Sequence, residues 1–141
     1  NGEAVLNVVE ELLDSFDLQN TVTAIGCVSQ HKDALKFHRD ERFLELLYRL
    51  EVLWDPSVYS KSEDEREEVA PNHLASVAAA IARMQPKRRD GTMHRILRTL
   101  AANAATLAPV ARPIDLTMLA WAFATLLKTP RTLMLCIACE A

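Results

Sequence analysis

Residues 113–128 read P-I-D-L-T-M-L-A-W-A-F-A-T-L-L-K, and this stretch decides the fold. Pro113 suits a turn or a first helical position, and Asp115 can cap a helix by accepting from free backbone N–H groups. Large apolar residues then recur at spacings of three and four, which places them on one helical face: Leu116, Leu119, Phe123 and Leu126. Pro130 ends this helix, and a second apolar segment from residue 133 to 141 completes a helix, turn, helix unit.

The same pattern occurs twice upstream. Residues 72–84 align without a gap with residues 114–126, at an offset of 42, and residues 16–28 align with residues 72–84 at an offset of 56. A period near 40 residues with two helices in each unit is typical of an α-solenoid. We therefore expect Leu18, Leu74 and Leu116 in equivalent buried positions. The alternative is an ordinary helical bundle whose amphipathic helices resemble one another by chance.

The chain is predicted to be one all-α domain, an α-solenoid of helix-turn-helix repeats that is a fragment of a longer array. Only three glycines among 141 residues and a hydrophobic content of 50% favour helices over strands. The expected parts are a second helix of a preceding repeat (1–15), repeat 1 (16–54), an acidic insertion (55–70), repeat 2 (71–109) and repeat 3 (113–141).

The insertion at residues 55–70 holds six acidic and two basic residues, so its local charge is −4. Such a segment buries too little apolar surface to order itself, and it reads as solvated. An acidic docking segment is the alternative. The net charge of −3 for the whole chain is too mild to imply a partner. Three cysteines, an odd number, suit a reducing compartment, and no apolar run reaches the length of a membrane span.

No set of residues points to catalysis, a metal or a cofactor. Cys136 and Cys139 have the spacing of half a zinc site, but a closed site needs four ligands. Both cysteines also fall within an apolar helical stripe, so we expect them to be buried. Cys27, His31 and His38 lack an Asp or Asn placed to orient a base. We therefore predict that the chain is not an enzyme.

Basic residues gather in the turn from the first to the second helix of each repeat. Equivalent turns line up along one edge of a solenoid, so the edge would carry a positive stripe, which is the electrostatic footprint of an RNA surface. Alternatively, lysine and arginine simply suit helix C-termini and solvent. The predicted RNA-binding residues are Lys32, Lys36, Lys87, Arg88, Arg89, Arg95, Arg98, Lys128 and Arg131.

The unit D-L-x-x-x-A-x-A-x-A-x-L, followed by a turn, a proline and a second helix, resembles the octotricopeptide and heptatricopeptide repeats. It is also similar to the helical arrays of proteins that carry a RAP domain, including the FASTK-like group. The residues that carry the resemblance are Asp115, Leu116, Leu119, Ala120, Trp121, Ala122, Phe123, Ala124, Leu126 and Pro130, with weaker copies at residues 74–84 and 17–28. His73 stands where the pattern has Asp.

The resemblance implies an organellar RNA-binding protein without catalytic residues in the repeats. The expected partners are ribosomal RNA or an organellar transcript and the neighbouring proteins of a ribonucleoprotein assembly, with no membrane. The expected location is the mitochondrion or another organelle, and the mitochondrial ribosome is one such assembly. The alternative function is a protein–protein interaction scaffold built from helical repeats. We also expect Trp121 to be at least half buried against a neighbouring helix.

Overall fold

The computed structural model describes residues 1–54, 69–84, 91–126 and 131–140. Within these ranges every regular element is a helix and there is no strand, which confirms the prediction of an all-α fold. In chain order the elements are α1 (Gly2–Leu12), η1 (Leu13–Ser15), α2 (Leu18–Gln30), α3 (Ala34–Phe37), α4 (Glu41–Trp54), α5 (Pro71–Met84), α6 (Gly91–Leu107), η3 (Ala108–Val110), α7 (Pro113–Thr125) and α8 (Arg131–Glu140).

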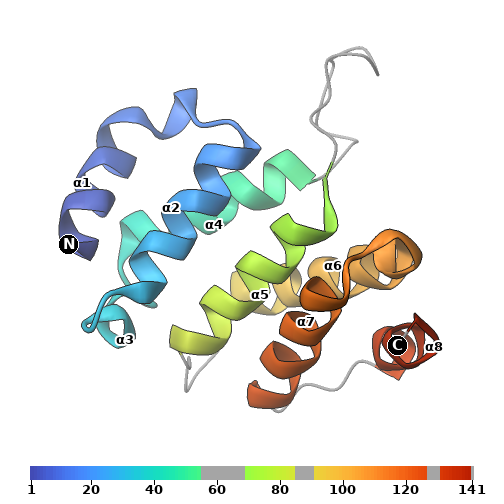
Figure 1. The fold of residues 1–141 in the computed structure, drawn as a ribbon. Helices are drawn as coiled ribbons and strands as arrows, with labels where there is room; N and C mark the ends of the chain where they lie inside the picture. Colours follow the sequence, from blue (N-terminus) through green and yellow to red (C-terminus); the bar gives the residue numbers. More distant parts are fainter. Residues whose placement is uncertain (55–68, 85–90, 127–130, 141) are drawn as a thin grey trace.

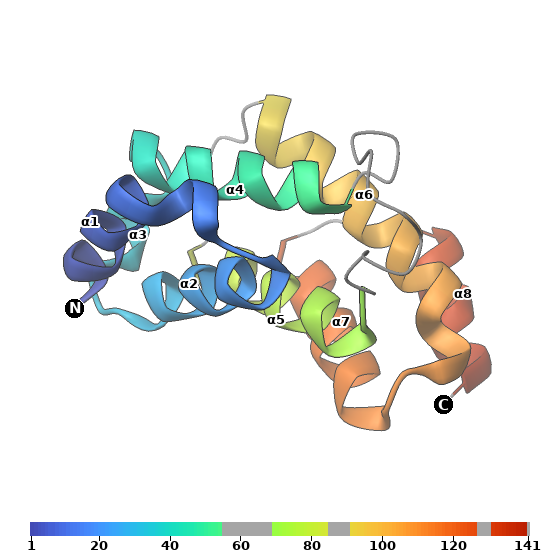
Figure 2. The same cartoon turned by 90° about the horizontal axis from the view of Figure 1, so that it is seen from above.

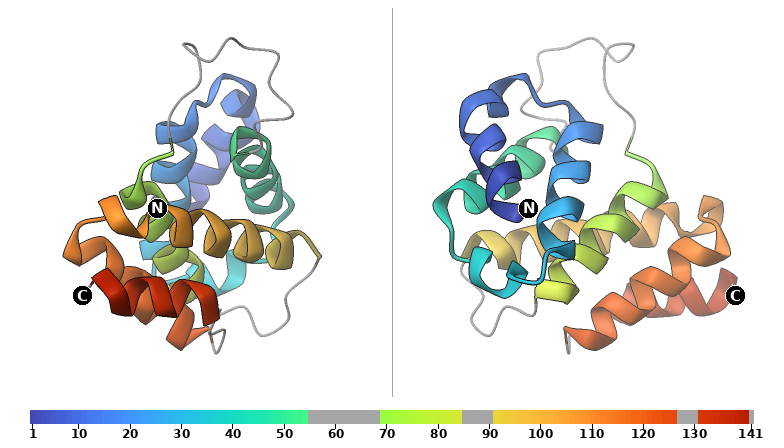
Figure 3. Two further views of the ribbon diagram at one scale, coloured as in Figure 1. Left: turned by 90° about the vertical axis from the view of Figure 1, so that its right-hand side faces the viewer. Right: turned by 60° about the vertical axis from the view of Figure 1, so that its left-hand side comes forward.

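Three helices, α2, α5 and α7, lie side by side and run in the same general direction (Figure 1). The central helix, α5, packs against both of the others. The helices α4, α6 and α8 lie on one side of this layer, and α1 packs on α2 and α4 (Figure 2). The second set is less regular than the first, because α6 crosses α4 steeply instead of running beside it (Figure 3, left).

Small residues explain how closely the first layer can pack. In α5 the side chains of Ala75, Ala78, Ala79, Ala80 and Ala82 are all buried, so the neighbouring helices can approach its backbone. The other layer contributes larger side chains, and the α4 stripe of Phe43, Leu46, Leu47 and Leu50 is fully buried. The core runs from α1 to α7 without a break.

The aligned positions of the three sequence copies have related environments. The first leucine of each copy is buried: the exposed fractions are 1% for Leu18, 0% for Leu74 and 5% for Leu116. The helices α5 and α7 also begin alike, each with a proline as its first residue. The N–H of Ala70 donates to Nδ1 of His73, three residues later, at 3.2 Å. The N–H of Arg112 donates in the same way to Oδ2 of Asp115, at 3.3 Å. The histidine therefore makes the backbone bond that the aspartate makes.

The start of α7 differs from the prediction in one respect. The cap residue is Arg112, and Asp115 is the third residue of the helix, where its carboxylate reaches back to the cap. This arrangement is the acidic half of a capping box, because the arginine side chain cannot accept a hydrogen bond from the backbone. In α2 the aligned aspartate does act as the cap, since Asp17 Oδ1 accepts from the N–H of Asn20 at 2.7 Å.

The structure overturns one expectation about burial and narrowly meets another. Cys139 is exposed and Cys136 is only partly buried, so the prediction of buried cysteines is wrong. The reason is that α8 packs mainly on α6 and η3, which leaves its other faces in solvent. Trp121 keeps 48% of its surface exposed, so slightly more than half is covered but the ring is not in the core.

Candidate nucleic-acid interface

The parallel course of α2, α5 and α7 brings the C-terminal ends of these helices to one edge of the molecule, along the lower left of Figure 1. Each predicted basic turn follows one of these ends in the sequence. Lys87, Arg88, Arg89 and Lys128 lie outside the described residues. We call this edge, with the chain segments attached to it, the turn edge.

Lys32 and Lys36 represent the first repeat on the turn edge. Lys32 is exposed in the turn that follows α2, and Lys36 lies on the short helix α3, which the sequence did not predict. The side chain of Lys36 is 79% exposed, and its ammonium lies 3.4 Å from Asp33 Oδ1. A surface pair of this kind stabilises the fold little, so the lysine can exchange this carboxylate for a phosphate at small cost.

Arg95 and Arg98 lie on α6, and the structure gives them different surroundings. Arg95 forms a two-pronged ion pair with Glu51 of α4, with Nε donating to Oε1 at 2.8 Å and Nη2 approaching Oε2 at 3.3 Å. This pair links α4 to α6. The carboxylate of Glu51 offsets the positive charge of Arg95, which was predicted to bind RNA. Arg98, three residues further along the helix, is exposed. Arg131 is exposed at the first residue of α8.

The opposite charge gathers on the α1–α4 side of the molecule. A groove between α1 and α4 is lined by Glu10, Glu11, Asp14 and Glu45, beside the exposed ring of Tyr48. Its one basic residue, Arg49, is engaged elsewhere, because its guanidinium donates to the backbone carbonyls of Asp14 and Phe16. A groove of this charge repels a phosphate backbone.

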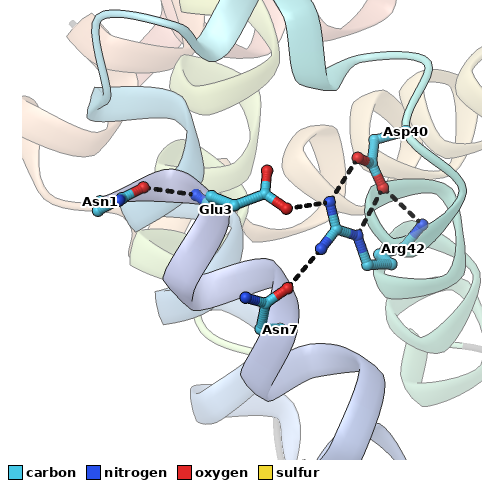
Figure 4. A network of polar contacts seen from close by, with 5 residues as sticks. All are labelled: Asn1, Glu3, Asn7, Asp40 and Arg42. Atoms are coloured by element: carbon cyan, nitrogen blue, oxygen red, sulfur yellow. Dashed lines mark hydrogen bonds and ion pairs between the residues drawn. The ribbon is translucent and has the colours of Figure 1, made fainter.

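A polar cluster around Arg42 joins α1 to the start of α4 and was not predicted from the sequence (Figure 4). Arg42 donates to Asn7 Oδ1 at 2.6 Å, to Glu3 Oε1 at 2.8 Å and to both carboxylate oxygens of Asp40 at 2.8 and 3.0 Å. Hydrogen bonds from Arg42 lower the pKa of Asp40. The guanidinium is fully used within the fold, so Arg42 is a structural residue and not a phosphate ligand.

Only the local half of this cluster, Asp40 with Arg42, could have been predicted from the sequence. Asp40 and Arg42 are close enough along the chain to be paired by inspection, but Glu3 and Asn7 belong to another helix. Only the packing of α1 on α4 brings the four side chains together. In the part of the chain that the structure describes, no three His, Cys, Asp or Glu side chains are grouped so that they could hold a metal ion.

Comparison with known proteins adds no identification, since no family model, curated protein or solved structure matches this chain. Among the helices of the described residues, none is long and apolar enough to span a bilayer.

Proposed function

We propose that this protein is an organellar RNA-binding helical-repeat protein that holds an RNA backbone along its turn edge. We assign it to the octotricopeptide, heptatricopeptide and RAP-domain group, to the mitochondrion, and to a ribonucleoprotein such as the mitochondrial ribosome, where its ligand is ribosomal RNA. In this proposal the chain is a piece of an α-solenoid and has no catalytic role.

One observation carries the proposal. The three parallel helices α2, α5 and α7 end at the same edge, and each is followed in the sequence by basic residues (Figure 1). Phosphate contacts are long-range and need no special geometry, so a row of such segments can hold an RNA backbone without reading its sequence. The regular stacking of these helices and the shared start of α5 and α7 support the repeat interpretation. The steep crossing of α6 over α4 makes the array an irregular one.

Charge separation supports the same interface. Residues 1–14 carry a net charge of −4, and so do residues 55–70. Without these two segments the net charge of −3 becomes +5. The positive charge therefore belongs to the three repeats, and a nucleic acid approaching the protein is steered toward them and away from the acidic groove.

The experiment compares two double substitutions that change the net charge equally. Lys32→Glu with Lys36→Glu reverses two charges on the turn edge, whereas Lys61→Glu with Arg66→Glu reverses two in the acidic insertion. We expect the first pair to weaken binding of a single-stranded RNA by about tenfold and to flatten its salt dependence by about 0.7 for each lost phosphate contact. The insertion pair should change both quantities much less. Equal effects of the two pairs would show that only net charge matters and would remove the turn edge as the binding surface.

A protein-interaction scaffold is the second candidate function. It is favoured by exposed apolar side chains on α7, the last helix of the layer, where Ile114 is 60% exposed and Trp121 is 48% exposed. Absence of any RNA affinity at low salt, for the unsubstituted protein, would place this function first.

A further inference from the structure

Two of the three cysteines lie together on α8. Cys136 and Cys139 are three positions apart in this helix, and residues with this spacing are neighbours on one helical face. Ile137, which follows Cys136, packs against the core, so the pair lies at the edge of the side of α8 that the fold covers. Cys139 is exposed and Cys136 is partly exposed. Neither cysteine is therefore closed off from solvent.

An intact α8 does not allow a disulfide between the two cysteines. Cβ atoms three positions apart on a helix are about 5–6 Å from each other, whereas a disulfide requires about 3.5–4.5 Å. A metal ion between the sulfur atoms removes this mismatch. Two metal–sulfur bonds of the zinc-thiolate length, about 2.3 Å each, span up to about 4.6 Å. The pair is therefore spaced for an ion that two thiolates hold, and not for a disulfide.

The number of ligands selects the class of ion. Within residues 1–54, 69–84, 91–126 and 131–140, no third His, Cys, Asp or Glu side chain joins the pair in a metal-binding group. Cys27 lies on α2, on the far side of α5 and α7 from α8 (Figures 1 and 2). Zinc takes four ligands in a closed site, so this pair alone does not hold it. Cu(I) is a soft cation that thiolates select, and two thiolates in line are enough for it.

We propose that Cys136 and Cys139 form a two-thiolate site for a soft monovalent cation, Cu(I), on the face of α8. Each thiol gives its proton to solvent, so the ion and two thiols yield a copper bis-thiolate with one negative charge and two released protons. No electron is transferred, and no further ligand is required. The site depends on the helix, since only the helical spacing brings the two thiols to one face.

Titration of the whole protein with Cu(I), under nitrogen and with ascorbate as the reductant, tests the site. The chelator bicinchoninate competes for the ion and reports the affinity by its colour. One ion should bind per chain. Cys136→Ser and Cys139→Ser should each weaken binding by at least about 100-fold, because the second thiolate of the pair binds intramolecularly. Cys27→Ser removes a thiol that is exposed elsewhere and should leave the affinity unchanged.

Two exchanges of neighbouring residues test the helical face without changing the composition. Cys139→Ala with Ala138→Cys places the thiols two positions apart, where they no longer face each other. This exchange should weaken binding as much as Cys139→Ser does. Cys139→Glu with Glu140→Cys places them four positions apart, again on one face, and should keep the affinity within about threefold of the original.

Circular dichroism confirms that each variant keeps its helices. The proposal is overturned if the unsubstituted protein binds Cu(I) no more tightly than Cys136→Ser, or if Cys27→Ser weakens binding as much as Cys139→Ser does. It is also overturned if the exchange of residues 138 and 139 leaves the affinity unchanged, or if sedimentation shows one ion shared by two chains. None of these measurements involves RNA, so the copper site and the proposed RNA surface stand or fall separately.

Discussion

Asp115 shows how much one side chain contributes to the start of a helix. Its carboxylate accepts from Arg112 Nε at 2.9 Å, from Nη2 at 3.0 Å and from the backbone N–H at 3.3 Å, while only 3% of the residue is exposed. Asp115→Asn removes the charge and turns one acceptor into a donor. We expect a loss of about 1–2 kcal/mol in the free energy of unfolding, measured by urea denaturation. A variant as stable as the original would show that the box contributes nothing.

The same residue should make stability depend on pH. The hydrogen bond from the Arg112 side chain lowers the folded pKa of Asp115 below its ordinary value of 3.8. A lowered folded pKa means that the unfolded chain binds the proton more tightly. The stabilisation is therefore complete above about pH 3.8 and is lost as the pH falls through the folded pKa. The stability difference between the protein and Asp115→Asn, followed by urea melts from pH 7 to pH 2.5, should shrink only at the acidic end.

Two aromatic residues on α7 provide a contrast in burial. Phe123 is 1% exposed and Trp121 is 48% exposed, although they are two positions apart on one helix. Phe123→Ala leaves a cavity in the core and should cost about 3–5 kcal/mol. Trp121→Ala should cost about 1–2 kcal/mol, because roughly half of the ring is already in water. Thermal or urea melts of the two variants decide this, and an equal loss would mean that Trp121 belongs to the core.

At the scale of helices, Arg42 fastens α1 to the rest of the fold. The contact between α1 and α4 includes its bonds to Glu3 and Asn7, and Arg49 holds the segment after α1 through two backbone carbonyls. Arg42→Ala should therefore raise the hydrogen-exchange rates of the α1 amides by roughly tenfold while those of α5 stay unchanged, since peripheral helices open locally. Arg98→Ala, at an exposed position of α6, is the control. Uniform acceleration in all helices would instead indicate global destabilisation.

Helix content and order could be predicted from the sequence, because apolar spacing and proline positions act locally. The starts of α5 and α7 at Pro71 and Pro113 follow from this signal. The short helix α3 could not be predicted, since a single turn has no periodicity to detect. The exposure of Cys139 was missed because an apolar stripe predicts a buried face only where another element covers it. The partnership of Arg95 with Glu51 depends on how α6 crosses α4, which no local pattern contains.

For the candidate site the sequence supplied the residues, and the fold shows that α2, α5 and α7, the helices that the basic turns follow, end at one edge. That the basic turns follow first helices was visible in the chain, but the shared direction of α2, α5 and α7 is a property of the packed layer. Arg42 and Arg49 are as basic as the predicted residues, yet their guanidinium groups are engaged by α1 and by the segment that follows it. Charge alone therefore could not separate the arginines engaged within the fold from those exposed to solvent.

At the scale of the whole molecule, the central helix α5 lies between α2 and α7. Lys87, Arg88 and Arg89 follow α5 in the sequence and lie outside the described residues. In the proposed function, an RNA strand along the turn edge crosses the end of α5. Helices in contact are about 8–10 Å apart, and the edge from α2 to α7 is therefore about 16–20 Å long. A very short RNA can reach one end turn and the central turn, whereas a longer one reaches all three.

The triple change Lys87→Glu, Arg88→Glu and Arg89→Glu should therefore weaken binding of short and long RNAs alike. It should reduce the salt slope by about 2, which corresponds to about 0.7 for each of three phosphate contacts on a single strand. The pair Lys32→Glu with Lys36→Glu should matter less for very short strands, which can use the third turn instead, than for strands that reach all three turns. Titration of uridine oligomers of increasing length at two or more salt concentrations measures both effects, with a circular-dichroism melt as the folding control. If the triple change and the Lys32–Lys36 pair show the same dependence on RNA length, the strand does not run along this edge.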